Sequence, residues 1–468
     1  MGEPAPFSTK RRAGAAPSAG LAVTPAALGA VAPRVDTGET APAASLAVRG
    51  TAAPRDARLD FFRGLALIMI YLNHVPGTVF EDYTNRNFGF SDAAEGFVIM
   101  SGIAAGLAYG RLMSGIVPIW QAVLRIWHRA WTLYMVHVVT TMMAIGISAY
   151  AADRFGVIEM VRINNLRVLF EDPLGVLVGI PSLGHQLGYF NILPMYAVLI
   201  FSAPLLIALG RRSPGGLMAA SVALWVLAGQ FRLNLPNHPN PGGWFFNPVA
   251  WQLVFVVGLL TGMALKEGRR FVAYRAWLFW ASVAMLLGAL AWMKIDLVRD
   301  AGRAGLAWLG AHGAPFYITN FDKTYLAAPR LLHALALFYV ISCLPVMLRV
   351  ARAHAAAPIA LLGRFGLPVF ATGSVLSILG QAIKKSDLPQ GLGLDLAVIG
   401  GGLAAQFAIA GAFWWVARNK QAPVRAARVE LSIPHQNGAV FTRPQTAAAG
   451  RQRRQAFPLL WPPSPPPR

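Results

Sequence analysis

The sequence predicts an all-α fold, that of a polytopic integral membrane protein with about ten transmembrane helices and both termini in the cytoplasm. Three observations support this prediction. Only 13% of the 468 residues are charged, against about 25% in an ordinary soluble domain, and the mean hydropathy is +0.50. Apolar stretches of about 18–25 residues, the length that crosses a hydrocarbon core, recur along the chain. Lys and Arg number 41 against 20 Asp and Glu, and they gather in the tails and in short loops.

The excess of basic residues limits the kinds of partner that the protein can have. A net charge of +21 in a soluble protein would indicate a nucleic-acid partner. Because this charge accompanies long apolar runs, we expect the lipid bilayer as a partner and no nucleic acid. The single cysteine, Cys343, excludes a disulfide framework and a cysteine-rich metal site.

The chain divides into three parts by composition. Residues 1–56 and 418–468 are rich in Ala, Pro and basic residues, and we expect both to be disordered tails. Residues 57–417 form the predicted transmembrane domain. Its ten expected spans cover residues 61–79, 93–110, 130–151, 188–209, 215–231, 248–265, 275–293, 330–348, 358–381 and 392–416.

The distribution of positive charge predicts the orientation of these spans. The loops after the even-numbered spans are short and basic; examples are Arg211-Arg212 and Arg269-Arg270. The other loops are longer, so their basic residues count less in the positive-inside rule. Both tails and the basic loops are therefore expected in the cytoplasm, and the long loops outside. Aromatic residues and Asn in the outer loops suit a carbohydrate, and an interfacial aromatic belt is the structural alternative.

The first expected span carries three ionisable residues on one helix face. Arg63 and His74 are separated by about three helical turns, and Asp60 lies one turn before Arg63. Ionisable groups are costly in lipid, so they are expected to face the bundle interior or a wet cavity. His74 can exchange protons near neutral pH, which makes it a candidate catalytic base. The structural alternative is that Arg63 reaches the headgroups and His74 hydrogen-bonds a neighbouring helix.

The start of the second expected span carries two carboxylates. Asp92 and Glu95 have the spacing of a helix N-cap and its partner, which explains them structurally as well as a role in the site does. Asn73, beside His74, is a further candidate for substrate binding. The small residues Ser101, Gly102 and Gly106 favour close helix packing rather than a nucleophilic role for Ser101. The sequence contains no Gly-x-Ser-x-Gly segment, so a serine-hydrolase mechanism is not favoured.

Further polar candidates lie in the later spans. Arg330 and His333 share a helix face, and Asp322 and Lys323 come shortly before them, so this segment is a candidate for recognition of the acyl group or its acceptor. His185 opens the fourth span and either lines a polar cavity or bonds a neighbouring helix. The histidines never occur at a metal-ligand spacing with a carboxylate, so no metal site is predicted.

The segment from Arg58 to Gly102 resembles a known family. The spacing of Arg63 and His74, with ten residues between them, looks like the Arg-x10-His motif of acyltransferase-3-type membrane acyltransferases. The sequence around this motif is similar to the OpgC branch, in the segments Arg58-Leu-Asp-Phe-Phe-Arg-Gly and Asn73-His74-Val-Pro-Gly. Further blocks agree, including Trp251-Gln252-Leu253, Asp322-Lys323-Thr324 and Arg330-Leu-Leu-His333, so that the resemblance covers residues 57–417. Trp251 joins the candidate substrate-binding residues on this ground. One departure is Phe365-Gly366, where a polar, His-containing segment is expected.

The resemblance implies succinylation of osmoregulated periplasmic glucans. His74 would act as the catalytic base and Arg63 would orient the donor. Asp60 is a catalytic candidate because it shares their helix face, where an Asp60–Arg63 pair is expected to act as a clamp at the inner surface of the membrane. Succinyl-CoA would be the donor substrate and no cofactor would be permanently bound. The expected location is a bacterial inner membrane, with a functional link to a glucan synthase. The alternatives are transfer of acetyl or another acyl group to a different extracytoplasmic polysaccharide, and transport of a glycan or acyl carrier without chemistry.

Overall fold

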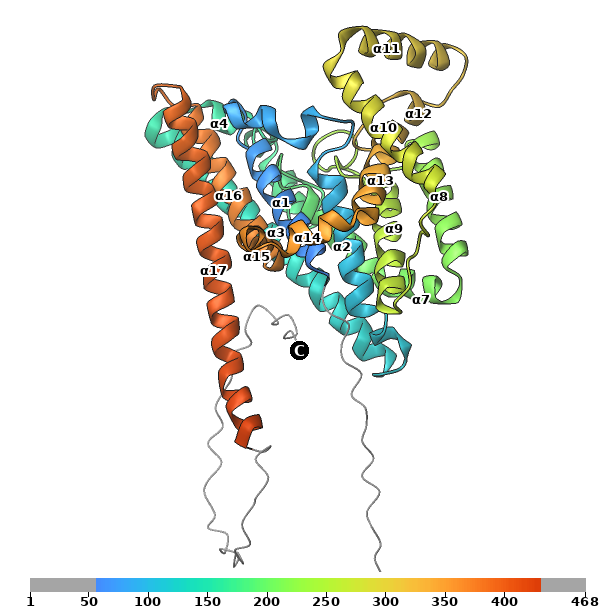
Figure 1. Cartoon of the computed structure of the whole chain (residues 1–468). Coiled ribbons are helices and arrows are strands. Elements are labelled where there is room, and N and C mark those ends of the chain that lie inside the picture. The colour runs from blue at the N-terminus through green and yellow to red at the C-terminus, as the bar shows by residue number, and fades with distance from the viewer. Residues whose placement is uncertain (1–55, 431–468) are drawn as a thin grey trace, which may run out of the picture. The chain divides into compact units, whose positions relative to one another are not determined.

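The computed structural model describes residues 56–430, and the regular secondary structure of this part of the chain is helical, without strands (Figure 1). An isolated bridge between Pro236 and Gly243 closes one loop. The predicted N-terminal tail lies outside the described residues except for Asp56. The last helix, α17 (Leu392–Glu430), continues past the predicted domain boundary at 417, and the rest of the predicted C-terminal tail is outside the described residues.

Several helices are long and apolar enough to cross a membrane, which confirms an all-α membrane protein. Seven helices in the described part meet this criterion by themselves, and an eighth span is formed if the bent pair α13 (Ala328–Cys343) and α14 (Pro345–Arg352), which meet at 77°, counts as one. The seven are α3 (Ile119–Phe155), α7 (Ile192–Arg212), α8 (Pro214–Phe231), α9 (Pro248–Lys266), α10 (Ala276–Lys294), α16 (Gly366–Lys384) and α17.

The first two of the ten predicted spans fall on shorter helices. Helices α1 (Ala57–Asn73) and α2 (Ala93–Tyr109) have 17 residues each. Helix α1 stops six residues before the predicted end at 79, because Pro76 and Gly77 follow its C-cap residue His74, and Gly77 adopts a positive φ of 84°. His74 therefore lies at the end of a helix and at the start of an irregular segment.

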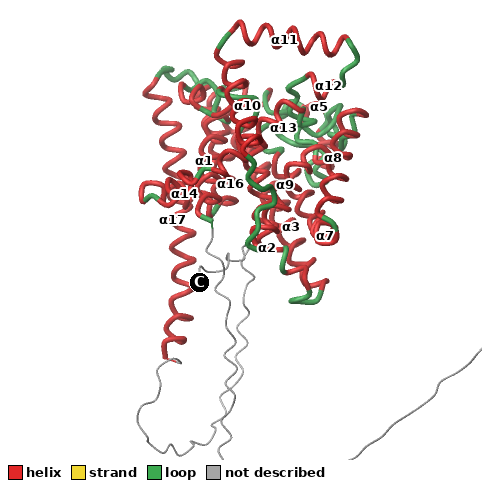
Figure 2. The backbone as a smooth tube through the Cα atoms, turned by 45° about the vertical axis from the view of Figure 1, so that its right-hand side comes forward, coloured by secondary structure: helices red, strands yellow, loops and turns green. Residues whose placement is uncertain are grey.

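Short helices connect the long ones. In chain order they are η1 (Val79–Tyr83), η2 (Asn85–Asn87), η3 (Leu112–Ser114), α4 (Glu159–Arg162), α5 (Val168–Glu171), α6 (Pro173–Gly179), α11 (Asp296–Ala311), α12 (Phe316–Thr319), η4 (His354–Ala356) and α15 (Ala357–Arg364). Much of the irregular chain lies on the same side of the bundle as α11 and α12 (Figure 2).

Glycines bring two pairs of helices into close contact. A Cβ on Gly102 or Gly106 of α2 would lie 2.2 or 2.3 Å from a backbone oxygen of α9, so these positions accept no side chain. In the same way, a Cβ on Gly64 of α1 would lie 1.9 Å from the Ile359 carbonyl oxygen of α15. The close packing expected of Gly102 and Gly106 is thus confirmed, and it fixes α2 against the centre of the bundle.

Candidate functional site

The N-terminus of α2 carries a complete capping box. The Asp92 carboxylate accepts a hydrogen bond from the Ala94 backbone N–H at 2.8 Å, and the Glu95 carboxylate accepts one from the Asp92 N–H at 2.9 Å. The structural explanation of these two residues is therefore correct. Capping is not their only interaction, because each carboxylate also contacts a basic side chain from a distant part of the sequence.

Arg330 and Lys323 neutralise the two carboxylates. Arg330, on α13, donates to the Glu95 carboxylate from Nε at 2.8 Å and from Nη2 at 2.5 Å, and its Nη2 is also 3.2 Å from Asp92. Lys323 Nζ lies 2.5 Å from Asp92 Oδ2, the same oxygen that Arg330 Nη2 contacts. We call these four residues the ionic cluster. It joins the start of α2 to α13 and to the segment before it, two regions that the sequence separates by more than two hundred residues.

Two side chains of the ionic cluster are removed from water, so their charges are costly unless they are paired. The Glu95 side chain is fully buried and that of Arg330 is 12% exposed. Burial would raise the pKa of Asp92, but the positive charges of Lys323 and Arg330 outweigh it and hold this pKa below its ordinary value. Asp92 is therefore a carboxylate whose negative charge Lys323 and Arg330 compensate.

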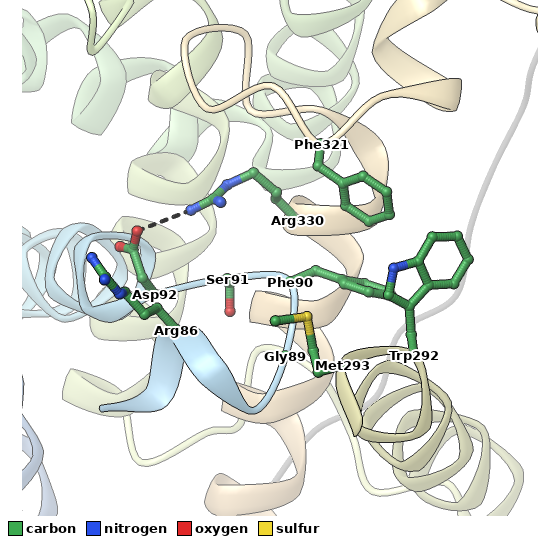
Figure 3. Close-up of a pocket in the computed structure, with 9 residues that line it drawn as sticks. All are labelled: Arg86, Gly89, Phe90, Ser91, Asp92, Trp292, Met293, Phe321 and Arg330. Carbon is green, nitrogen blue, oxygen red and sulfur yellow. Dashed lines mark hydrogen bonds and ion pairs between the residues drawn. The ribbon is translucent and has the colours of Figure 1, made fainter. Parts of the chain in front are cut away.

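A cavity of about 250 Å³ opens beside the ionic cluster. Its lining has a charged side and an aromatic side, as Figure 3 shows. On the aromatic side the Phe90 ring contacts Trp292 and Phe321, with centroids 5.6 and 4.8 Å away. The lining residues are Arg86, Gly89, Phe90, Ser91, Asp92, Trp292, Met293, Phe321 and Arg330. A cavity of this kind suits a small group that is polar on one side and apolar on the other, as a sugar ring is.

His333 forms a hydrogen-bonded pair with Ser91 at this cavity. The Ser91 hydroxyl is 2.7 Å from His333 Nδ1, and the Ser91 backbone N–H donates to the same nitrogen at 3.3 Å. Gly89 makes room for the ring, because a Cβ there would lie 2.1 Å from His333 Nε2. Arg330 and His333 lie one helical turn apart, so α13 presents both to the start of α2.

His74 lines a different cavity. Its ring lies against that of Tyr189, with the centroids 4.4 Å apart and the ring planes tilted by 43°. Its Nδ1 is buried and has no hydrogen-bond partner among residues 56–430. The cavity beside it, about 10 Å³, holds no more than a water molecule. The neighbouring Asn73 accepts a hydrogen bond from Thr84 at 2.7 Å and so ties the end of α1 to the loop that follows.

Arg63 and Asp60 lie about three and about four helical turns back along α1 from His74. Arg63 Nη2 donates to the Met100 carbonyl of α2 at 3.1 Å, and Asp60 is 9% exposed where α1 crosses α15. Arg63 therefore fixes α1 against α2. In the described residues neither side chain lines the two cavities at His74 and Ser91.

Of the remaining candidate residues, some hold the segment that carries Lys323 in place, and others lie away from the ionic cluster. Trp251 is fully buried, and its indole N–H donates to the Lys323 carbonyl at 2.9 Å, so it holds the segment that delivers Lys323. Asp322 caps the same turn by accepting the Tyr325 N–H at 2.8 Å. His185 is fully buried and contacts Asn240, 3.1 Å from its Nδ1, rather than the ionic cluster. Within residues 56–430 no group of three His, Cys, Asp or Glu side chains has a geometry for a metal ion.

The structure adds lining residues that the sequence did not single out. The aromatic side of the cavity consists of Phe90, Trp292 and Phe321, and no pattern in the sequence links these three rings. Ser91 and Arg86 are also new. The sequence feature that could have drawn attention to Ser91 is its position directly before the charged helix N-cap Asp92.

Residues 55–418 match the family model described as OpgC protein, which covers most of the chain. The chain belongs to the OpgC family. Among curated proteins the comparison finds no similar sequence. OpgC membership together with the apolar helices indicates a membrane protein of an acyltransferase family. The wider acyltransferase-3 relationship stays a prediction.

Proposed function

We propose that this OpgC protein is a membrane O-acyltransferase that moves a succinyl group from succinyl-CoA to hydroxyl groups of osmoregulated periplasmic glucans. The observation that carries the proposal is the cavity at the start of α2. It combines arginine and aromatic side chains with a histidine-bonded serine at its wall. Family membership supports acyl transfer as the reaction class.

The lining of the cavity fits both partners of this reaction. Aromatic faces pack against the apolar face of a sugar ring, which Phe90, Trp292 and Phe321 can provide. A succinyl group differs from an acetyl group by a free carboxylate. Arg86, whose side chain is 41% exposed and pairs with Glu81, is the cation at this cavity that solvent and an anionic substrate reach most easily. These features favour a dicarboxylic acyl group and a carbohydrate acceptor.

His74 is proposed as the base for the acceptor hydroxyl. A hydroxyl is a poor nucleophile until a base removes its proton, and a ring nitrogen without a partner in the resting protein is free to accept one. Because Tyr189 covers the ring, the acceptor must displace Tyr189 or enter beside it. Arg63 is proposed to support this arrangement by fixing α1 against α2, and the outer side of the membrane is the proposed place of the acceptor.

The test is mass spectrometry of periplasmic glucans from a strain that lacks its own copy of the gene. Complementation with the wild-type protein is expected to restore a mass increase of one or more succinyl groups per glucan, and His74→Ala is expected to abolish it. His185→Ala, at a buried histidine away from the ionic cluster, serves as the matched control, with protein level checked in each strain. Acetylated glucans would contradict the succinyl assignment, and unmodified glucans would contradict the reaction.

A further inference from the structure

We propose that Ser91 is a catalytic nucleophile and that the reaction passes through a succinyl ester on its hydroxyl. This inference rests on the proposed function, because it specifies how the acyl group moves from donor to acceptor. It concerns a residue to which neither the sequence nor the family resemblance gives a role. The argument starts from the two hydrogen bonds between Ser91 and His333.

The two hydrogen bonds indicate which atoms of Ser91 and His333 carry a proton. His333 Nδ1 accepts the backbone N–H of Ser91 at 3.3 Å, so this nitrogen carries a lone pair and no proton. The Ser91 hydroxyl, 2.7 Å from the same nitrogen, must then donate its proton to it. A hydroxyl that donates to a neutral imidazole is the arrangement that activates serine as a nucleophile.

The position of Ser91 suits the chemistry that follows. Its side chain lies in the wall of the 250 Å³ cavity (Figure 3), and the residue is only 3% exposed, so an ester there is shielded from bulk water. Arg86, the more exposed of the two arginines that line this cavity, carries a positive charge that favours the negative charge developing on the carbonyl oxygen during attack. A nucleophile and a cation for the oxyanion thus line one cavity, and the base is hydrogen-bonded to the nucleophile.

In the first step the Ser91 oxygen attacks the carbonyl carbon of the succinyl-CoA thioester. His333 Nδ1 takes the hydroxyl proton, the carbon–sulfur bond breaks, and coenzyme A leaves as a thiolate. In the second step a glucan hydroxyl attacks the ester carbonyl while His74 takes its proton. The bond from the carbonyl carbon to the Ser91 oxygen breaks, and His333 returns its proton to that oxygen. The proton on His74 passes to solvent, so atoms and charges balance without an oxidant or reductant.

His333 and His74 then have separate roles that can be tested. His333 serves Ser91 in both steps, whereas His74 serves the acceptor in the second step alone. Loss of His333 is therefore expected to prevent acylation of Ser91. Loss of His74 is expected to allow acylation and to trap the ester.

The experiment uses the full-length protein in detergent with isotopically labelled succinyl-CoA, first without acceptor and then with a short β-glucan oligosaccharide. After rapid acid quench, peptide mass spectrometry is expected to find the label on the Ser91 peptide of the wild type and, in higher yield, of His74→Gln. No label is expected on His333→Gln or Ser91→Ala. Ser91→Ala is expected to lose transfer by about a hundredfold or more, the range for removal of an activating base or its nucleophile. Ser377→Ala, which removes another buried serine hydroxyl, is the control and keeps both signals.

The possible results separate this inference from the proposed function. If the wild type transfers succinyl but neither it nor His74→Gln carries label on Ser91, the nucleophile assignment is wrong and the proposed function stands. If Ser91→Ala transfers at the wild-type rate, the assignment is equally wrong. If the folded wild type neither transfers succinyl nor becomes labelled, the proposed function itself is overturned. Because the labelling is measured on the wild type, a variant that fails to fold does not weaken the test.

Discussion

Arg330 is the residue on which the ionic cluster depends most. It donates to both carboxylates, and one of them, Glu95, has no other basic partner within salt-bridge distance among the described residues. Removing one member of a buried ion pair leaves the other charge without compensation, which costs far more than removing the pair. Arg330 therefore has a structural role as well as a place in the cavity wall.

Arg330→Met is expected to destabilise the protein by about 3–5 kcal/mol, because Glu95 then stays buried without a counter-ion. The double variant Arg330→Met with Glu95→Gln should recover a large part of this loss, since both charges are gone. Unfolding in detergent, followed by intrinsic tryptophan fluorescence in urea, measures both. Equal stability of the single and double variants would contradict the buried pair.

The ionic cluster also predicts how stability depends on pH. The folded-state pKa of Asp92 lies below its ordinary value of 3.8, so its contribution to stability is present above that value, starts to be lost as the pH approaches it, and is fully lost only below the folded-state pKa. We expect wild type to be more stable than Asp92→Asn near pH 7, and this advantage to shrink as the pH falls from about 5 to about 3. Thermal unfolding of both proteins across this range measures the difference. An advantage that grows with acidification would show that Asp92 is protonated at neutral pH.

The capping box could be predicted from the sequence because its signal is local. Asp92 and Glu95 stand at fixed spacing before an apolar run, and the structure places them as the spacing indicates. Their partners could not be predicted, because Lys323 and Arg330 come from a distant loop and helix, and no local pattern reports such a contact. The same applies to Ser91 and His333.

At the scale of elements, α2 and α9 form a close helix contact beside the cavity. A Cβ on Gly258 would lie 2.1 Å from the Ile99 carbonyl oxygen, and one on Gly102 would lie 2.2 Å from that of Phe255. Small residues at this spacing were sufficient to predict close packing, although not the identity of the partner helix. The end of α1 was less predictable, since the apolar run continues through Val75 whereas the helix stops before Pro76.

Gly258→Ala is expected to force α2 and α9 apart and to cost about 1–3 kcal/mol, as overpacking does in a close-packed interior. Gly288→Ala on α10 is the matched control, because a Cβ there meets nothing within 4 Å. The midpoint of thermal unfolding should fall for the first variant and stay level or rise slightly for the second. Equal midpoints would indicate that the α2–α9 contact is looser than described.

At the scale of the whole molecule, the charge distribution predicts the orientation in the membrane. The cavity at Ser91 and the ionic cluster lie at the N-terminal end of α2, which the proposed topology places outside. That side is where a periplasmic glucan would be found, so a donor made in the cytoplasm must reach the Ser91 cavity through the protein. The basic loops, such as that between α9 and α10, would then face the anionic headgroups of the cytoplasmic leaflet.

Thiol labelling tests this orientation. In a Cys343→Ser background, Gln390→Cys lies in the exposed loop between α16 and α17, and Glu267→Cys lies in the loop between α9 and α10. A membrane-impermeant maleimide that is small enough to enter the periplasm is expected to label Gln390→Cys in intact cells and Glu267→Cys only after lysis. The reverse pattern would place the Ser91 cavity in the cytoplasm and would contradict an extracytoplasmic acceptor.

The central claim is that the protein makes a covalent bond between an acyl group and a glycan. The most direct measurement uses purified protein in proteoliposomes with isotopically labelled succinyl-CoA and a β-glucan acceptor, and follows the acceptor by mass spectrometry. The account predicts succinyl ester on the glucan with wild-type protein and none with His74→Ala. Glucan that crosses the bilayer but keeps its original mass would contradict the account and would indicate a transporter.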